Sequence, residues 1–201
     1  FSWPVARDGI SVGGLFALGY ATQATALQTS NAGLQAFLLS LTVIVCPALE
    51  ALLDQKRQPA SVWWSAGLAM LGVGLLQGDA MASGTAAPGD LLGMLQAVFF
   101  GAGFYVCERA MTRHAADTSE FGLPVAITFY EMITILACAL VWLGASDGPE
   151  ALPTLLQTVG SLSLTETPEL IAAVLWTGLV TTAGACVAEA AVLGRISSSD
   201  A

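Results

Sequence analysis

One carboxyl group, that of Glu131, falls inside a long apolar segment, Gly122–Ala145, about 12 Å from its start at roughly 1.5 Å per residue. A carboxylate at that depth is costly in lipid, so its side chain is expected to face the protein interior. Thr128 and Cys138 share its helical face and give it a partly polar wall. Such a group could bind a cation or exchange protons. A glutamate that only hydrogen-bonds a neighbouring helix is the open alternative.

Uncharged polar side chains in other apolar segments could hydrogen-bond a small solute. They are Gln23, Gln35, Thr42 and Gln96. Each of them alone is also typical of a contact between two membrane helices. Glu50 and Glu189 lie nearer the ends of their segments and are expected to be structural, with Glu189 extending toward Arg195.

These groups must be positioned by apolar segments, of which Asn31–Asp54 is the most informative. It is about long enough to cross a bilayer as a helix and carries no charge before Glu50. At about 100° per residue, its polar and small positions fall within roughly 60° of one another: Asn31, Gln35, Thr42 and Cys46. Pro47 is expected to kink this helix.

The composition favours a membrane protein. Hydrophobic residues make up 55% of the 201, charged residues only 10%, and the mean hydropathy is +0.73. A soluble domain typically has about 25% charged residues, so few charges are left to coat a water-facing surface. A soluble helical bundle is the alternative. The net charge of −9 argues against a nucleic-acid partner.

Residue types that carry enzyme chemistry are sparse. The four cysteines are dispersed through apolar segments without a CxxC or Cys/His spacing, which predicts neither a metal site nor a disulfide framework. The single histidine, His114, has no nucleophile beside it in the pattern of a hydrolase. We therefore expect no enzyme, no metal and no cofactor.

Six apolar segments are expected to span a membrane: Ser11–Leu27, Asn31–Asp54, Ala60–Gly78, Leu91–Cys107, Gly122–Ala145 and Glu169–Leu193. Phe1–Ile10 is expected as a polar N-terminal stretch, Glu108–Phe121 as a charged loop and Ala151–Leu164 as an interfacial segment. Every Lys and Arg falls in alternate connections, counting the N-terminal stretch as the first: Arg7, Lys56, Arg57, Arg109, Arg113 and Arg195. This positive-inside pattern places those connections in the cytoplasm.

Small residues recur at every fourth position along the fourth segment: Gly89, Gly93, Ala97 and Gly101. That spacing lets the backbones of two membrane helices approach closely, so these residues and Pro47 are expected to be structural. Coincidence in a chain rich in Ala and Gly is the alternative. Gln96 lies on the same face.

A short internal match suggests an inverted repeat. Gln28–Ala32 (QTSNA) aligns with Ser197–Ala201 (SSSDA), and both stretches close a segment rich in Gly, Ala and Thr. The first and sixth segments are then equivalent and five positions apart in the order of spans, and an odd offset makes the two copies run in opposite directions. Inverted repeats are common among secondary transporters, with the substrate path between the halves.

The sequence resembles a known family in three stretches: GLFALGYATQATALQTSNAGLQAFLLSLTVIVCPALEALL, SAGLAMLGVGLLQGD and GDLLGMLQAVFFGAGFYVCERAMTR. They are similar to the EamA-type branch of the drug/metabolite transporter superfamily. The resemblance implies an all-α membrane protein of ten helices in two inverted five-helix repeats, of which this chain holds helices three to eight. Residues 1–78 would end the first repeat, 79–90 form a non-cytoplasmic linker and 91–201 begin the second.

The resemblance implies export or exchange of small organic metabolites by alternating access. Expected partners are a small-molecule solute, the lipid bilayer and protons as a coupling ion, with a homodimer left open; nucleic acid is not expected. The location would be the plasma membrane or an organelle membrane such as that of a plastid. The alternative is a membrane scaffold or assembly subunit that transports nothing, which would need no inward-facing Glu131, Gln35 and Thr42.

The topology makes a direct prediction. Cysteines introduced at Lys56 and Arg113 should react with a membrane-impermeant thiol reagent only from the cytoplasmic side, and cysteines at Ser83 and Ser161 only from the other side. The unmodified chain, with its four native cysteines, gives the background labelling. Reaction of positions 56 and 83 from the same side would contradict six spans.

Overall fold

Every element of the described chain is helical. The computed structural model describes residues 2–55, 58–82, 88–115, 122–148, 150–160 and 168–193. The helices are α1 (Trp3–Ala26), α2 (Ala32–Leu39), α3 (Thr42–Leu53), α4 (Ala60–Ala82), α5 (Pro88–His114), α6 (Gly122–Asp147), α7 (Ala151–Gly160), α8 (Pro168–Leu175), the π-helix η1 (Trp176–Gly184) and α9 (Ala185–Leu193). The prediction of an all-α chain is confirmed over these ranges.

Four stretches in these ranges are long and apolar enough to cross a membrane: Ala32–Leu53, Pro88–His114, Gly122–Ser146 and Pro168–Leu193. They are consistent with a membrane protein. Several positions used in the sequence analysis lie outside the described residues: Lys56, Arg57, Ser83, Ser161, Arg195 and the repeat at 197–201.

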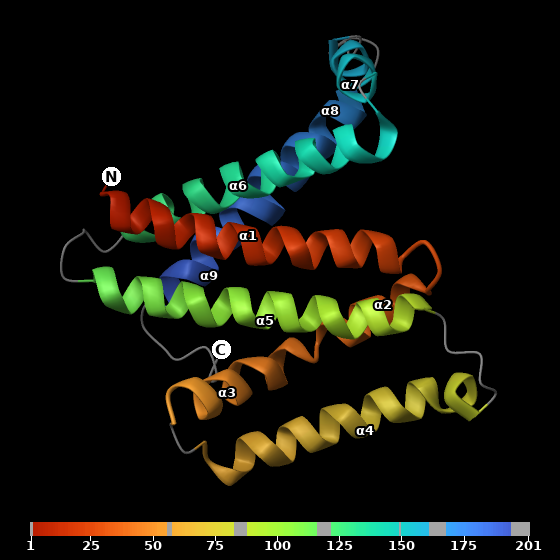
Figure 1. Cartoon of the computed structure of the whole chain (residues 1–201), viewed down its shortest axis with the longest axis vertical. Helices are drawn as coiled ribbons and strands as arrows, with labels where there is room; N and C mark the ends of the chain where they lie inside the picture. The colour runs from red at the N-terminus through yellow and green to blue at the C-terminus, as the bar shows by residue number, and fades with distance from the viewer. Residues whose placement is uncertain are drawn as a thin grey trace.

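Helix α1 is the centre of the bundle. It packs along α5 on one side and against α6 on another, while α2 and α3 cover a second side of α5 (Figure 1). Val12 and Phe16 of α1 meet Phe100 of α5, Ile127 of α6 and Leu193 of α9 in one buried apolar cluster. The core therefore forms between segments that are far apart in the sequence.

Two glycines bring α1 against the backbone of α6. A Cβ atom at Gly9 would lie 2.8 Å from the Tyr130 Cβ and 3.0 Å from the Ile127 carbonyl oxygen. At Gly13 it would lie 2.7 Å from the Glu131 carbonyl oxygen and 2.9 Å from the Glu131 Cα. At each of the two positions a Cβ would make at least one contact shorter than 3.0 Å, which real Cβ atoms essentially never make, so glycine permits this close approach.

The row of small residues on α5 faces α2 and α3. Gly89 lies against the turn after α1, and a Cβ there would be 2.5 Å from the Ala26 carbonyl oxygen. Gly93 lies against Gln35 and Leu38, and Gly101 lies against Val45. Ala97, between them, is fully buried. The period-four spacing thus corresponds to one packed face of α5.

The segment Asn31–Asp54 is interrupted at Ser40 and Leu41, between α2 and α3. The backbone amides of Ser40 and Leu41 donate to the carbonyls three residues earlier, at 3.0 and 3.1 Å. The Ser40 and Thr42 hydroxyls also donate to carbonyls three residues earlier, at 2.6 and 2.7 Å. Hydroxyl side chains that take backbone acceptors compete with regular helix bonding, which accounts for the break there. Pro47 lies buried inside α3.

Two predicted boundaries are wrong. Helix α1 begins at Trp3, with a proline in its first turn, so most of Phe1–Ile10 is helix. Helix α5 extends to His114, so Glu108–His114 forms its last two turns, where a loop was expected. Both errors arose from reading charged residues as loop. The charges at Asp8, Arg109 and Arg113 are instead paired across helices.

Helix α1 gives a prediction about stability. Gly13→Ala should lower the free energy of unfolding by about 1–3 kcal/mol, because the added methyl meets the α6 backbone. Gly14→Ala is the matched control, since a Cβ there has nothing within 4 Å; it should be neutral or stabilising by up to about 1 kcal/mol. Unfolding in mixed micelles measures both, and equal losses would contradict the glycine contact.

Candidate functional site

A cavity of about 880 Å³ lies between α1, the α2–α3 stretch, α5, η1 and α9. Its wall carries polar side chains from four of these elements: Tyr20, Gln23, Ser40, Thr42, Thr181, Thr182 and Glu189. Apolar and aromatic groups make up most of the rest. A mostly apolar hollow with a few converging polar groups is the usual form of a small-molecule site.

One wall of the cavity is aromatic. Phe16 and Tyr20 of α1 meet Phe100 and Phe104 of α5, and all four rings line the cavity. The centroids of Phe16 and Phe104 are 5.2 Å apart, and those of Tyr20 and Phe100 are 5.0 Å apart, both edge to face. Gly19 and Gly103 leave space for the rings. A Cβ at Gly103 would overlap the Phe16 ring, and a Cβ at Gly19 would lie 2.9 Å from the Phe100 ring.

Two carboxyl groups approach this space from different helices. Glu189 of α9 lines the cavity directly. Glu131 of α6 is only 2% exposed, and its Oε1 has no hydrogen-bond partner within the described residues. Cys186, which also lines the cavity, interacts with the Glu131 carboxyl, and Glu189 and Tyr20 lie within electrostatic range of it. Glu131 therefore lies just behind the cavity wall.

The structure separates the other sequence candidates into two groups. Gln23 and Thr42 line the cavity. Gln35 and Gln96 instead join α2 to α5: the Gln35 Nε2 donates to the Gly89 carbonyl at 3.1 Å, and the Gln96 Nε2 donates to the Gln35 carbonyl at 3.0 Å. Thr128 is buried one turn before Glu131 on α6.

Gln35 and Gln96 each keep one side-chain oxygen without a hydrogen-bond partner in the described part of the chain. Asn31, on the predicted polar face, is exposed and caps α2, accepting from the Gly33 amide at 2.8 Å.

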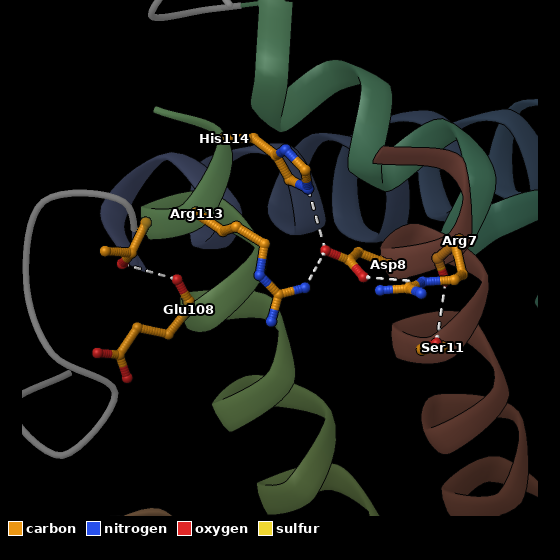
Figure 2. Close-up of polar contacts among 7 residues, drawn as sticks. Arg7, Asp8, Ser11, Glu108, Arg113 and His114 are labelled. Atoms are coloured by element: carbon orange, nitrogen blue, oxygen red, sulfur yellow. Dashed lines mark hydrogen bonds and ion pairs between the residues drawn. The ribbon is translucent and has the colours of Figure 1, made fainter. Parts of the chain in front are cut away.

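A charged cluster lies at the far end of α1 from the aromatic wall. Asp8 of α1 accepts from Arg113 Nη1 at 2.8 Å and lies 3.0 Å from His114 Nε2, both on the last turn of α5 (Figure 2). The Asp8 side chain is 10% exposed and that of His114 8%, whereas the Arg113 side chain is 54% exposed and reaches Asp8 from the solvent side. The cluster ties the start of α1 to the end of α5.

A second charged group ties α3 to α5. Asp54, at the end of α3, pairs with Arg109 and accepts from the Tyr105 hydroxyl at 2.9 Å. The Arg109 guanidinium also lies over the Tyr105 ring, 4.9 Å from its centroid. At the opposite end of α5, the Ser30 hydroxyl donates to Asp90 at 2.6 Å. These contacts place Asp54, Arg109 and Asp90 near helix ends.

Sequence reasoning missed the aromatic wall and the position of Glu189. A signal for the wall was present, because Phe16 and Tyr20, and likewise Phe100 and Phe104, are four residues apart and share a helical face. Glu189 carried no such signal; it lies in α9, directly after the π-helix η1. The η1 hydrogen bonds include Thr182 Oγ1 to the Thr177 carbonyl, five residues earlier, at 2.9 Å.

No protein-family model, curated protein or solved structure matches this chain.

The Asp8 cluster gives a prediction. Asp8→Asn should lower the free energy of unfolding by about 1–3 kcal/mol, because Arg113 and His114 then lose the charged form of a nearly buried hydrogen-bond acceptor. Arg7→Gln is the control: its side chain is 68% exposed and 3.8 Å from Asp8, so its loss should cost at most about 1 kcal/mol. Faster amide hydrogen exchange at the start of α1 should accompany Asp8→Asn alone. Equal effects of the two variants would contradict the proposed link.

Proposed function

We propose that this protein is a secondary transporter of small organic solutes, and that the cavity between α1, α2–α3, α5 and α9 is part of the solute path. The observation that carries the proposal is the cavity itself, which combines aromatic, hydroxyl, amide and carboxyl groups within a bundle of long apolar helices. A solute needs such groups to exchange its hydration shell for protein contacts on its way across lipid.

The finer topology is part of the same proposal. Six spans, with the basic connections in the cytoplasm, account for the distribution of all six Lys and Arg residues. The resemblance to EamA-type transporters adds an inverted five-plus-five repeat, in which this chain supplies helices three to eight. The break between α2 and α3 beside the cavity supports such a mechanism, because interrupted membrane helices tend to border substrate sites.

The competing function is that of a membrane scaffold, which requires packed helices but no internal polar cavity. A scaffold has no use for polar side chains aimed into an internal hollow, and burial of Glu131 would only cost it stability. The cavity and the carboxyl beside it therefore favour transport. Uptake by the protein in liposomes separates the two functions.

Glu131 is the proposed coupling residue. Its carboxyl is buried in the middle of α6, its Oε1 lacks a hydrogen-bond partner among the described residues, and Cys186 connects it to the cavity wall. A carboxyl in that position could hold a proton when the cavity faces one side and release it when the cavity faces the other. Thr128 and Cys186 would then serve as its neighbours in the path.

The test measures uptake of radiolabelled amino acids and amines by proteoliposomes that contain the full-length protein, from mildly acidic to mildly basic pH. Glu131→Gln keeps the size and hydrogen-bonding capacity of the side chain but removes its titration. We expect this variant to insert normally and to lose the pH dependence of uptake. Glu131→Leu should abolish uptake if the carboxyl also contacts the solute.

Glu169→Gln is the matched control, because it removes the same charge from the exposed first turn of α8. It should keep the wild-type pH profile. A wild-type profile in Glu131→Gln would show that Glu131 is structural, and absence of any uptake by the wild-type protein would favour the scaffold.

A further inference from the structure

We propose that the cavity selects small organic cations that carry an apolar or aromatic body, with Glu189 as the counter-charge and the four-ring wall as the cation-binding surface. This inference rests on the proposed function for its biological setting, but it concerns binding, which can be measured on its own.

The first argument is charge. Glu189 is the one ionisable carboxyl among the described lining residues, and no Lys, Arg or His is found among them. Glu131 lies within electrostatic range of Glu189 behind the wall. Anionic solutes would meet no compensating group in this part of the wall, whereas a cation would meet an attractive field that low-dielectric surroundings strengthen.

The second argument is the aromatic wall. Phe16, Tyr20, Phe100 and Phe104 present four rings from two helices to one side of the cavity. Their centroid separations of 5.0–5.6 Å show that they pack as one cluster. Ring faces attract ammonium groups most strongly where water is excluded, and clustered aromatic rings are the usual way in which proteins recognise quaternary ammonium ions.

The third argument is that the carboxyl groups and the aromatic wall lie next to each other. Tyr20 belongs to the aromatic wall, and its hydroxyl lies within electrostatic range of both Glu131 and Glu189. The ring wall and the carboxyls therefore border the same volume. That volume, about 880 Å³, is in the range that accepts a drug-sized molecule. Thr181, Thr182 and Gln23 add hydrogen-bonding groups for a polar substituent on the solute.

The experiment compares three probes of similar size on the purified full-length protein: benzyltrimethylammonium, whose positive charge is fixed, benzyl alcohol, which is neutral, and phenylacetate, which is anionic. Equilibrium dialysis of the radiolabelled probes gives the affinities. We expect benzyltrimethylammonium to bind at least about ten-fold more tightly than either of the others. This comparison needs no variant, so it holds even if a substitution fails to fold. Equal affinities, or a preference for phenylacetate, would overturn the proposal.

Variants assign the selectivity to residues. Glu189→Gln should weaken benzyltrimethylammonium binding about ten-fold, with little effect on benzyl alcohol. Glu169→Gln removes a carboxylate from the start of the same helical stretch, away from the cavity, and should leave binding unchanged. Phe104→Leu should weaken cation binding about three-fold, while Phe129→Leu, on an exposed α6 position, should not. Unchanged binding in well-folded Glu189→Gln would overturn the assignment.

A parallel uptake assay in proteoliposomes keeps the two proposals separate. Selective binding of benzyltrimethylammonium without uptake of any solute would reject the transport function and leave the cation site in place. Uptake of neutral or anionic solutes without cation binding would reject the cation site and leave transport in place.

Discussion

The close approach of α1 to its neighbours is the contact on which the rest of this structure depends. Gly9 and Gly13 place α1 directly on the α6 backbone, at the turn that carries Glu131. Gly19 and Gly103 let the α1 and α5 rings interlock, which forms the aromatic side of the cavity. In lipid, where apolar side chains gain little from leaving the solvent, this dense backbone contact is the main source of helix association. The burial of Glu131 and the shape of the cavity both follow from it.

Several polar side chains lie where the structure provides each of them with a hydrogen-bond or ion-pair partner. Fully charged pairs, such as Asp8 with Arg113 and Asp54 with Arg109, join helix ends. Between them, the buried α2–α5 contact uses neutral amides, whose transfer from water costs far less than that of an ion. Glu131 and Glu189 are exceptions to this distribution of charged pairs, because neither has an ion-pair partner in the described residues. A carboxyl without an ion-pair partner is costly in lipid, which is why these two residues were chosen for the tests above.

The features predicted from the sequence are those that depend on residues close together in the chain. The helical class follows from apolar segment lengths, and the packed face of α5 follows from a four-residue spacing of small side chains. Pairings between distant residues could not be predicted. Asp8 and Arg113 are 105 positions apart, so each charge was interpreted alone, as a sign of an exposed polar stretch or loop. The break between α2 and α3, which the Ser40 and Thr42 hydroxyls accompany, was not predicted, because hydroxyl residues are common in apolar segments that continue as one helix. The position of Glu189 in the cavity wall arises from contacts between helices far apart in the sequence, for which the chain carries no local pattern.

Helix α1 also has a consequence for biogenesis. Although it is the hub of the bundle, it is not among the four described stretches that are long and apolar enough to cross a membrane by themselves. Its first turns carry Arg7 and Asp8, and its glycines offer little side chain to lipid. The helices that shelter it, α5 and α6, are synthesised more than sixty residues later. The contacts that bury α1 can therefore form only after α5 and α6 have emerged from the ribosome.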